Sequence, residues 1–145
     1  MRKVSPREAH ELMRDEGFVY LDVRSVPEFE EGHPASAYNV PIAEPDEGGM
    51  RDNPDFVRQV QAAFPLSTKL VVGCATGVRS RAAVERLAAS GYAMMVEQAA
   101  GMLGVRDAFG RLVVPGWRSE GLPVSSEPEP GHGFRDLLVR SRATT

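Results

Sequence analysis

Apolar residues fall along the chain in two alternating patterns, short continuous runs and segments with helical spacing. The short runs, which are typical of buried strands, lie at 18–23, 37–40, 69–73 and 92–96. The helical segments, marked by apolar stripes or by start and stop residues, lie at 6–16, 26–31, 54–64 and 79–90. Strands that alternate with helices predict an α/β domain with parallel strand pairing.

Start and stop residues support the first two of these helices. Ser5 and Glu8 have the spacing of a capping box, in which the serine accepts from the glutamate amide and the glutamate reaches back. Ser25 and Glu28 repeat the pattern. Gly17 provides a stop for the first helix, because glycine readily adopts the left-handed conformation of a helix end.

Less regular segments separate the predicted elements. Residues 43–51, rich in proline, glycine and acids, are predicted to form a solvated loop. Asn53 and Pro54 look like the cap and first residue of the third helix. Residues 99–103 are predicted to begin a further helix, and 108–117 a turn with an extended excursion.

The last twenty residues differ in character from the rest. We predict a globular domain over 1–125 and a linker-like tail over 126–145, because 127–131 alternates proline with acids and ends in glycine. Residues 134–140 form either a short amphipathic helix or part of the tail.

The predicted fold is therefore α/β, with a mainly parallel sheet of about five strands and helices on both faces. In such sheets ligands collect at the carboxyl ends of the strands. Cys74 directly follows the strand at 69–73 and lies at this edge.

Composition excludes several classes of protein. A chain of 145 residues is one domain's worth of sequence, and a net charge of -3 argues against a nucleic-acid partner. The sequence shows no secretory signal and no apolar window of roughly 20 residues, so we expect a cytoplasmic protein without a membrane partner. The one cysteine excludes an internal disulfide and a sulfur-rich zinc site.

The segment 74–80 carries the candidate chemistry. A lone cysteine is more often a small buried apolar residue. Here, however, Cys74 lies between a strand and a helix, where loop amides and the helix amino terminus favour thiolate over thiol. Gly77 permits a tight backbone path, and Arg79 adds a permanent cation.

This loop resembles that of the rhodanese family of sulfurtransferases, in which a cysteine in a six-residue loop accepts a sulfane sulfur. The resemblance covers about residues 3 to 125, and 105–117 looks like an insertion within it. The matching positions outside the loop are Leu21-Asp22-Val23-Arg24, Glu28-Phe29, Gly32-His33, Ala37, Asn39, Pro41, Gly101 and Gly121-Leu122-Pro123-Val124.

The resemblance implies a sulfurtransferase that needs no metal and no organic cofactor. Cys74 would be the catalytic nucleophile, taking sulfur from thiosulfate or a related small donor and passing it as a persulfide to an external thiol or cyanide. The implied substrate-binding residues are Ala75, Thr76, Gly77, Val78, Arg79 and Ser80. The oligomeric state is not predicted.

Two other functions stay open. One is a non-catalytic sulfur-sensing or interaction module whose persulfide is read by a partner. The other is a phosphatase or an arsenate reductase, which the loop length disfavours: four residues separate Cys74 from Arg79, one fewer than in those relatives.

The roles of four polar residues near the loop are also open. The Thr76 hydroxyl either donates to the persulfide or caps the local backbone. Ser80 is expected to start the helix rather than touch substrate. Asp22 and Arg24, at the end of a neighbouring strand, either face the same crevice as accessory residues or form an ion pair that fixes its surroundings, the role we favour for Asp22.

Overall fold

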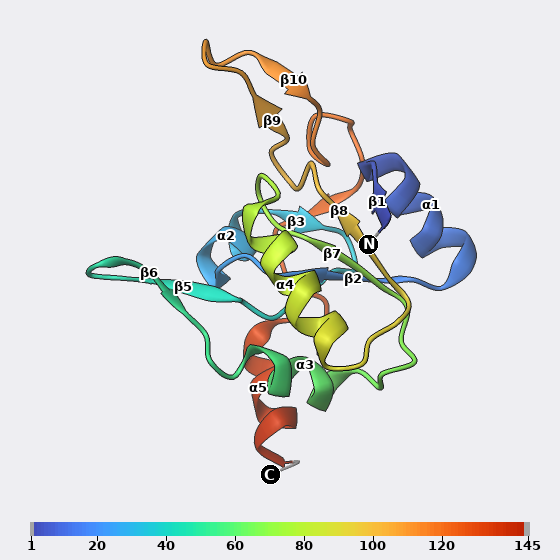
Figure 1. Ribbon diagram of the computed structural model, residues 1–145, viewed down its shortest axis with the longest axis vertical. Helices are drawn as coiled ribbons and strands as arrows, with labels where there is room; N and C mark the ends of the chain where they lie inside the picture. The colour runs from blue at the N-terminus through green and yellow to red at the C-terminus, as the bar shows by residue number, and fades with distance from the viewer. Residues whose placement is uncertain (1, 144–145) are drawn as a thin grey trace.

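The computed structural model describes residues 2–143, and its centre is a parallel sheet (Figure 1). Its five strands run in the order β1-β8-β7-β2-β4, and each neighbouring pair is parallel. The strands are β1 (Arg2–Val4), β8 (Met95–Gln98), β7 (Leu70–Gly73), β2 (Val19–Asp22) and β4 (Tyr38–Asn39). The predicted α/β class and parallel sheet of about five strands are confirmed.

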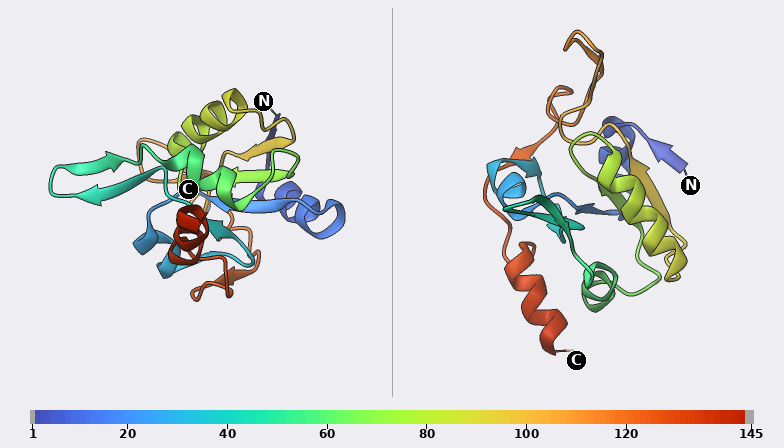
Figure 2. Two further views of the ribbon diagram at one scale, coloured as in Figure 1. Left: turned by 90° about the horizontal axis from the view of Figure 1, so that it is seen from below. Right: turned by 60° about the vertical axis from the view of Figure 1, so that its left-hand side comes forward.

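Helices cover both faces of the sheet, as predicted. Apolar residues of α3 (Phe56–Ala63), α4 (Val78–Ala89) and α5 (Phe134–Ala143) pack with Leu70 and Val72 in one core. Residues of α1 (Pro6–Glu16) and α2 (Val26–Glu31) pack with Tyr20 and Val71 in the other core. Figure 2 shows α4 and α1 on opposite sides of the strands. The alternation of β7 side chains therefore divides the interior into two layers.

The predicted helix starts are confirmed for α1 and α2. Ser5 accepts from the Glu8 amide and Glu8 from the Ser5 amide, and Ser25 forms the same box with Glu28. Gly17 ends α1 in the left-handed conformation. These signals succeed because capping depends only on residues three positions apart.

The predicted cap of the third helix is wrong by two residues. Helix α3 begins at Phe56, and Asp55 precedes it as the cap without a side-chain hydrogen bond. The Asn53 amide group instead donates to the Pro41 carbonyl and to Gln59. Asn53 thus ties α3 to the chain that precedes it.

The loop predicted at 43–51 is also wrong. The segment is an antiparallel hairpin of β5 (Ala43–Asp46) and β6 (Gly49–Asp52), which projects from the body in Figure 1. The Asp46 carboxylate accepts from the Gly48 amide at 2.9 Å and so shapes the turn. Cross-strand backbone hydrogen bonds outweigh the low strand propensity of this composition.

Two further boundaries shift around β8. The strand begins at Met95 rather than at residue 92. Tyr92 is instead buried in the core, where its hydroxyl donates to the Phe64 carbonyl at 2.6 Å. Residues 99–103 form turns rather than the start of a helix. Gly101 has φ +69°, which interrupts any helical path there.

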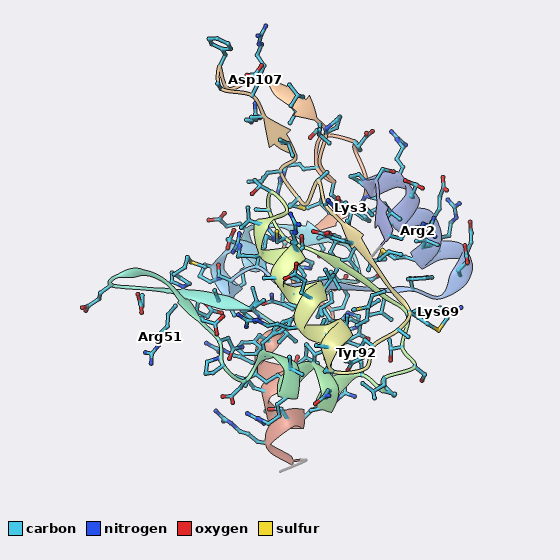
Figure 3. The ribbon with its side chains drawn as sticks, in the orientation of Figure 1. Arg2, Lys3, Arg51, Lys69, Tyr92 and Asp107 are labelled. Carbon is cyan, nitrogen blue, oxygen red and sulfur yellow. The ribbon has the colours of Figure 1, made fainter. Side chains whose placement is uncertain are left out.

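The carboxyl-terminal part of the chain adds three pieces. Residues 105–114 form a projecting hairpin of β9 (Val105–Arg106) and β10 (Leu112–Val114), on which Figure 3 places Asp107 far from the sheet. Strand β11 (Val124–Ser125) pairs with β3 (His33–Pro34). Helix α5 then packs on the domain, with Leu137 fully buried. Of the two alternatives at 134–140, the structure shows the helix.

None of the helices in the described part of the chain is both long and apolar enough to cross a membrane.

Candidate active site

Three strand ends meet at the edge of the sheet that carries Cys74. Gly73, the last residue of β7, lies opposite Asp22 of β2 and Gln98 of β8. Cys74 therefore follows the central strand of the sheet, flanked by the ends of its two neighbours. The prediction that the cysteine stands at the carboxyl edge is confirmed.

The sulfur of Cys74 is held by backbone amides. The Gly77 amide donates to Sγ at 3.1 Å and the Ser80 amide at 3.3 Å. Ser80 belongs to the first turn of α4, so the positive end of the helix also points toward the sulfur. Donors to a sulfur stabilise its anion more than its thiol. The loop thus gives two backbone donors and a helix amino terminus to a sulfur whose residue is only 2% exposed.

Glycine before the cysteine is required by Tyr20. A Cβ added to Gly73 would overlap the phenol oxygen of Tyr20, which is fully buried on the neighbouring strand. That oxygen accepts from the Gln98 side chain at 3.2 Å. Burial raises the pKa of the Tyr20 phenol, so the group stays neutral beside the site.

A second backbone segment supports the loop from β8. The Met102 amide donates to the Cys74 carbonyl at 2.8 Å, and the Leu103 amide to the Ala75 carbonyl at 3.0 Å. Gly101 makes this approach possible, since its Cβ would overlap the Ala75 carbonyl oxygen. The turn at 99–103, predicted as a helix, is therefore a support for the cysteine loop.

Arg79 does not point freely at the sulfur. Its guanidinium donates to both carboxylate oxygens of Glu28 at 2.6 and 2.9 Å. These hydrogen bonds lower the pKa of Glu28 to about 2 and raise the pKa of Arg79. The loop cation is thus largely balanced by a carboxylate from α2, a partner that the sequence did not identify.

Asp22 and Arg24 form a buried pair next to the loop. The Arg24 guanidinium donates to Asp22 at 2.7 to 3.1 Å and to the Gly32 carbonyl at 2.7 Å. Within residues 2–143 neither side chain hydrogen-bonds Cys74. Their contacts are those of a clamp between β2 and the end of α2.

The remaining loop residues divide between buried and exposed. Ala75 is buried, whereas Val78 is 78% exposed and Thr76 is also exposed. Thr76 lines a surface hollow of about 360 Å³ together with Leu103, Gly104, Val105 and Arg106. This hollow, which we call the Thr76 hollow, lies where the loop meets the base of the β9–β10 hairpin.

Ser80 lies closer to the chemistry than the sequence suggested. Its Oγ is 3.5 Å from the Cys74 sulfur and 2.8 Å from a carboxylate oxygen of Glu97. Glu97, a buried residue of β8, is the second acidic group that the sequence did not identify. The available signal was its position near the carboxyl end of a parallel strand, but the predicted strand ended at residue 96.

The fold and the loop together define a class: an α/β protein that presents a thiolate-stabilising cysteine loop at the carboxyl end of a central parallel strand. Within this class, the chain belongs to the rhodanese-like family, because the family model described as Rhodanese-like domain matches residues 5–107. Sequence relatives agree with this membership. The chain is 37% identical over 123 residues to "Thiosulfate sulfurtransferase 16, chloroplastic" of Arabidopsis thaliana, an alignment that covers 85% of this chain and 92% of that protein.

Further relatives are similar over most of their length. "Thiosulfate sulfurtransferase 18" of Arabidopsis thaliana is 30% identical over 115 residues, which cover 78% of this chain and 76% of that protein. The crystal structure of Rv0390 from M. tuberculosis superposes with a TM-score of 0.73 at 26% identity, covering 88% of this chain and 98% of the other. The human single-domain sulfurtransferase TSTD1 shares the fold, with a TM-score of 0.56 at 24% identity over 70% of this chain and 91% of the other.

Proposed function

We propose that this protein is a sulfurtransferase that moves a sulfane sulfur from thiosulfate, or a related donor, through a Cys74 persulfide to a thiol or cyanide. The observation that carries the proposal is the pair of amide hydrogen bonds to Sγ, from Gly77 and Ser80. They stabilise the anion that must attack, and relatives named thiosulfate sulfurtransferase support the choice of donor.

The reaction has two displacement steps. The Cys74 thiolate attacks the outer sulfur of thiosulfate, an S–S bond forms, and sulfite leaves with the electrons of the bond that breaks. The acceptor then attacks the outer sulfur of the persulfide, and Cys74 leaves as a thiolate. The chain has no second cysteine that could take the sulfur, so an external acceptor completes each cycle.

The surroundings suggest where the donor binds. Thiosulfate is a dianion, and the charge of Arg79 is already engaged by Glu28. Arg106 lines the Thr76 hollow and offers a second cation beside the loop. We therefore assign the sulfonate end of the donor to the Thr76 hollow, with its outer sulfur directed toward Cys74.

Intact-mass measurement tests the proposal directly. Incubation with thiosulfate should add one sulfur atom to the wild-type protein, and cyanide should remove it as thiocyanate. Cys74→Ser is the matched control and should neither gain mass nor form thiocyanate. Full thiocyanate formation by Cys74→Ser would overturn the assignment.

Assays on the same protein preparation distinguish the proposed sulfurtransferase from the alternative functions. A sensing or interaction module would hold the persulfide but turn over small acceptors negligibly. A phosphatase or arsenate reductase would hydrolyse phosphate esters or reduce arsenate without gaining sulfur. The cytoplasmic location expected from the sequence stays a prediction, and several related proteins carry names that place them in the chloroplast.

A further inference from the structure

Glu97 is a buried carboxyl group without a charged partner in the part of the chain that the structure describes. The residue is 3% exposed, and the hydrogen bond to its side chain comes from the Ser80 hydroxyl at 2.8 Å. Buried carboxylates are normally paired with cations, because removing a charge from water is costly. Neither the fold nor the amide cradle of the sulfur accounts for an acid at this position.

The sheet register places Glu97 beneath the cysteine loop. Glu97 lies opposite Val72 on the neighbouring strand, one position before the pair of Gly73 and Gln98. Side chains alternate along a strand, so Glu97 faces the same side as Val72, which is the side covered by α4. The first turn of α4 carries Ser80 into the space between Glu97 and Cys74.

The hydrogen bonds of Ser80 have a definite direction. Its hydroxyl has one hydrogen, and the candidate acceptors are Glu97 at 2.8 Å and the Gly77 carbonyl at 3.2 Å. The carboxyl oxygen of Glu97 is the closer of the two acceptors. The Ser80 oxygen is then free to accept from the Cys74 thiol, whose sulfur is 3.5 Å away. The three groups form one chain that leads from thiol to hydroxyl to carboxylate.

We propose that Ser80 and Glu97 carry the proton of Cys74 during sulfur transfer, an inference that rests on the proposed function and extends it. Ser80 touches the reacting sulfur and is a catalytic residue. Glu97 acts through Ser80 and is a positioning residue that stores the proton. During the transfer cycle one negative charge moves between Glu97 and Cys74, so the buried site does not carry both charges while sulfur is transferred.

The proton balance covers both steps. During loading, the S–H bond of Cys74 breaks, its proton joins Ser80 Oγ, and the Ser80 proton passes to Glu97. The thiolate then attacks thiosulfate and sulfite leaves. During unloading, the acceptor takes the outer sulfur, and the departing Cys74 sulfur recovers a proton through Ser80 from Glu97. Glu97 is thus a base in the first step and an acid in the second.

The other titratable groups near Cys74 and Glu97 keep a constant charge around neutral pH. Tyr20 from β2 and Arg79 from α4 are close enough to interact electrostatically with Cys74. Tyr20 stays neutral because burial raises its pKa, and Arg79 stays charged in its pair with Glu28. Asp22 is held by Arg24. Of the groups named here, Cys74 and Glu97 are therefore the two that the proposed proton relay uses.

Thiolate absorbance tests the inference without any sulfur donor. Cys74→Ser provides the baseline, because the chain has one cysteine. If Cys74 and Glu97 share a proton, the wild-type thiolate signal rises in two steps with pH, since the titrations are coupled. Glu97→Gln keeps a hydrogen-bonding side chain but cannot hold the proton, so its signal should rise in one step. Glu97→Asp should restore two steps. Identical profiles for the wild type and Glu97→Gln would overturn the inference.

Single-turnover loading provides the second measurement. We expect Glu97→Gln and Ser80→Ala each to slow persulfide formation from thiosulfate at least about tenfold at neutral pH, and Glu97→Asp to lose less. Unchanged loading in both variants would also overturn the relay. If the wild type shows two thiolate steps but gains no sulfur, the proposed function fails while the proton pair stands. Ser80→Ala removes the hydroxyl that connects Cys74 to Glu97, so the relay can still be tested if Glu97→Gln fails to fold.

Discussion

Glu28 and Arg79 are 51 positions apart in the sequence, yet the carboxylate of one takes two hydrogen bonds from the guanidinium of the other, at 2.6 and 2.9 Å. The pair joins α2 to the start of α4 and fixes the helix whose first turn donates to the cysteine. Arg79 therefore acts on the site partly through position, by holding α4, as well as through its charge.

Loss of this pair should change the acid stability of the protein. Arg79 lowers the pKa of Glu28 to about 2, below its ordinary value of 4.5. The pair therefore stabilises the fold fully above about pH 4.5, and this stability is lost as pH falls toward 2. Because both side chains are partly exposed, we expect a contribution of about 1 kcal/mol. Urea unfolding between these pH values should show a smaller pH dependence for Glu28→Gln than for the wild type.

Glu30→Gln is the matched control for that measurement, since Glu30 lies exposed on the same helix. Its unfolding curves should follow those of the wild type at every pH. A Glu28→Gln profile that is parallel to the wild type would contradict the role of the pair.

Glu28→Gln should also strengthen thiosulfate binding. Removing the carboxylate charge leaves the Arg79 cation unbalanced beside the loop, and a dianionic donor should be attracted more strongly. We expect a severalfold lower KM for thiosulfate at low ionic strength, with the difference shrinking as salt is added. Steady-state thiocyanate assays at two salt concentrations would measure this, and an unchanged KM at low salt would argue against it.

Gly73→Ala should destabilise the protein. The new methyl group would overlap the Tyr20 phenol oxygen in a buried region, and we expect a loss of about 1–3 kcal/mol in the free energy of unfolding. Adding Tyr20→Phe removes the oxygen and should recover part of the loss, which a double-mutant cycle would detect. Gly48→Ala has room for its methyl group and should stay within about 0.5 kcal/mol of the wild type. Equal effects of the two alanines would exclude the proposed clash.

Leu137→Ala tests whether the last helix belongs to the folded unit. Leu137 of α5 is fully buried in the core that also holds Val60 of α3, so its truncation should cost about 2–5 kcal/mol. Val139 on the same helix is 65% exposed, and Val139→Ala should be close to neutral. Chemical denaturation of both variants would decide. If Leu137→Ala were as stable as Val139→Ala, the boundary predicted at residue 125 would describe the stable unit better than the full chain.

Local patterns account for what the sequence predicts well. The capping boxes of α1 and α2 and the placement of Cys74 after β7 each depend on a few adjacent residues. Strand pairing between segments far apart in the sequence could not be predicted from such local patterns. Strand β1 has two charged residues among its three and becomes a strand only because β8 offers its edge. The hairpin at 43–52 likewise depends on cross-strand pairing.

The same distinction between local and distant residues holds for the candidate site. The Cys74 loop could be recognised from contiguous residues, whereas Glu28 and Glu97 reach it from other elements. Nothing in the spacing of Glu97 relative to Ser80 signals a contact, because the register of β7 against β8 decides which of two alternating faces the carboxyl group occupies.

The order of strands has a consequence for how the chain becomes folded during its synthesis. Among the five strands β1 is synthesised first, yet its backbone pairs with β8. The pairing of Arg2 with Val96 therefore cannot form until β8 has been synthesised. The inner pair of β2 and β7 can form earlier, before the last partner has been translated. A ribosome-bound fragment ending before β8 would therefore leave the Cys74 loop and the first strand without the contacts that β8 and residues 101–103 provide, and the reactive edge of the sheet would be completed only late in translation.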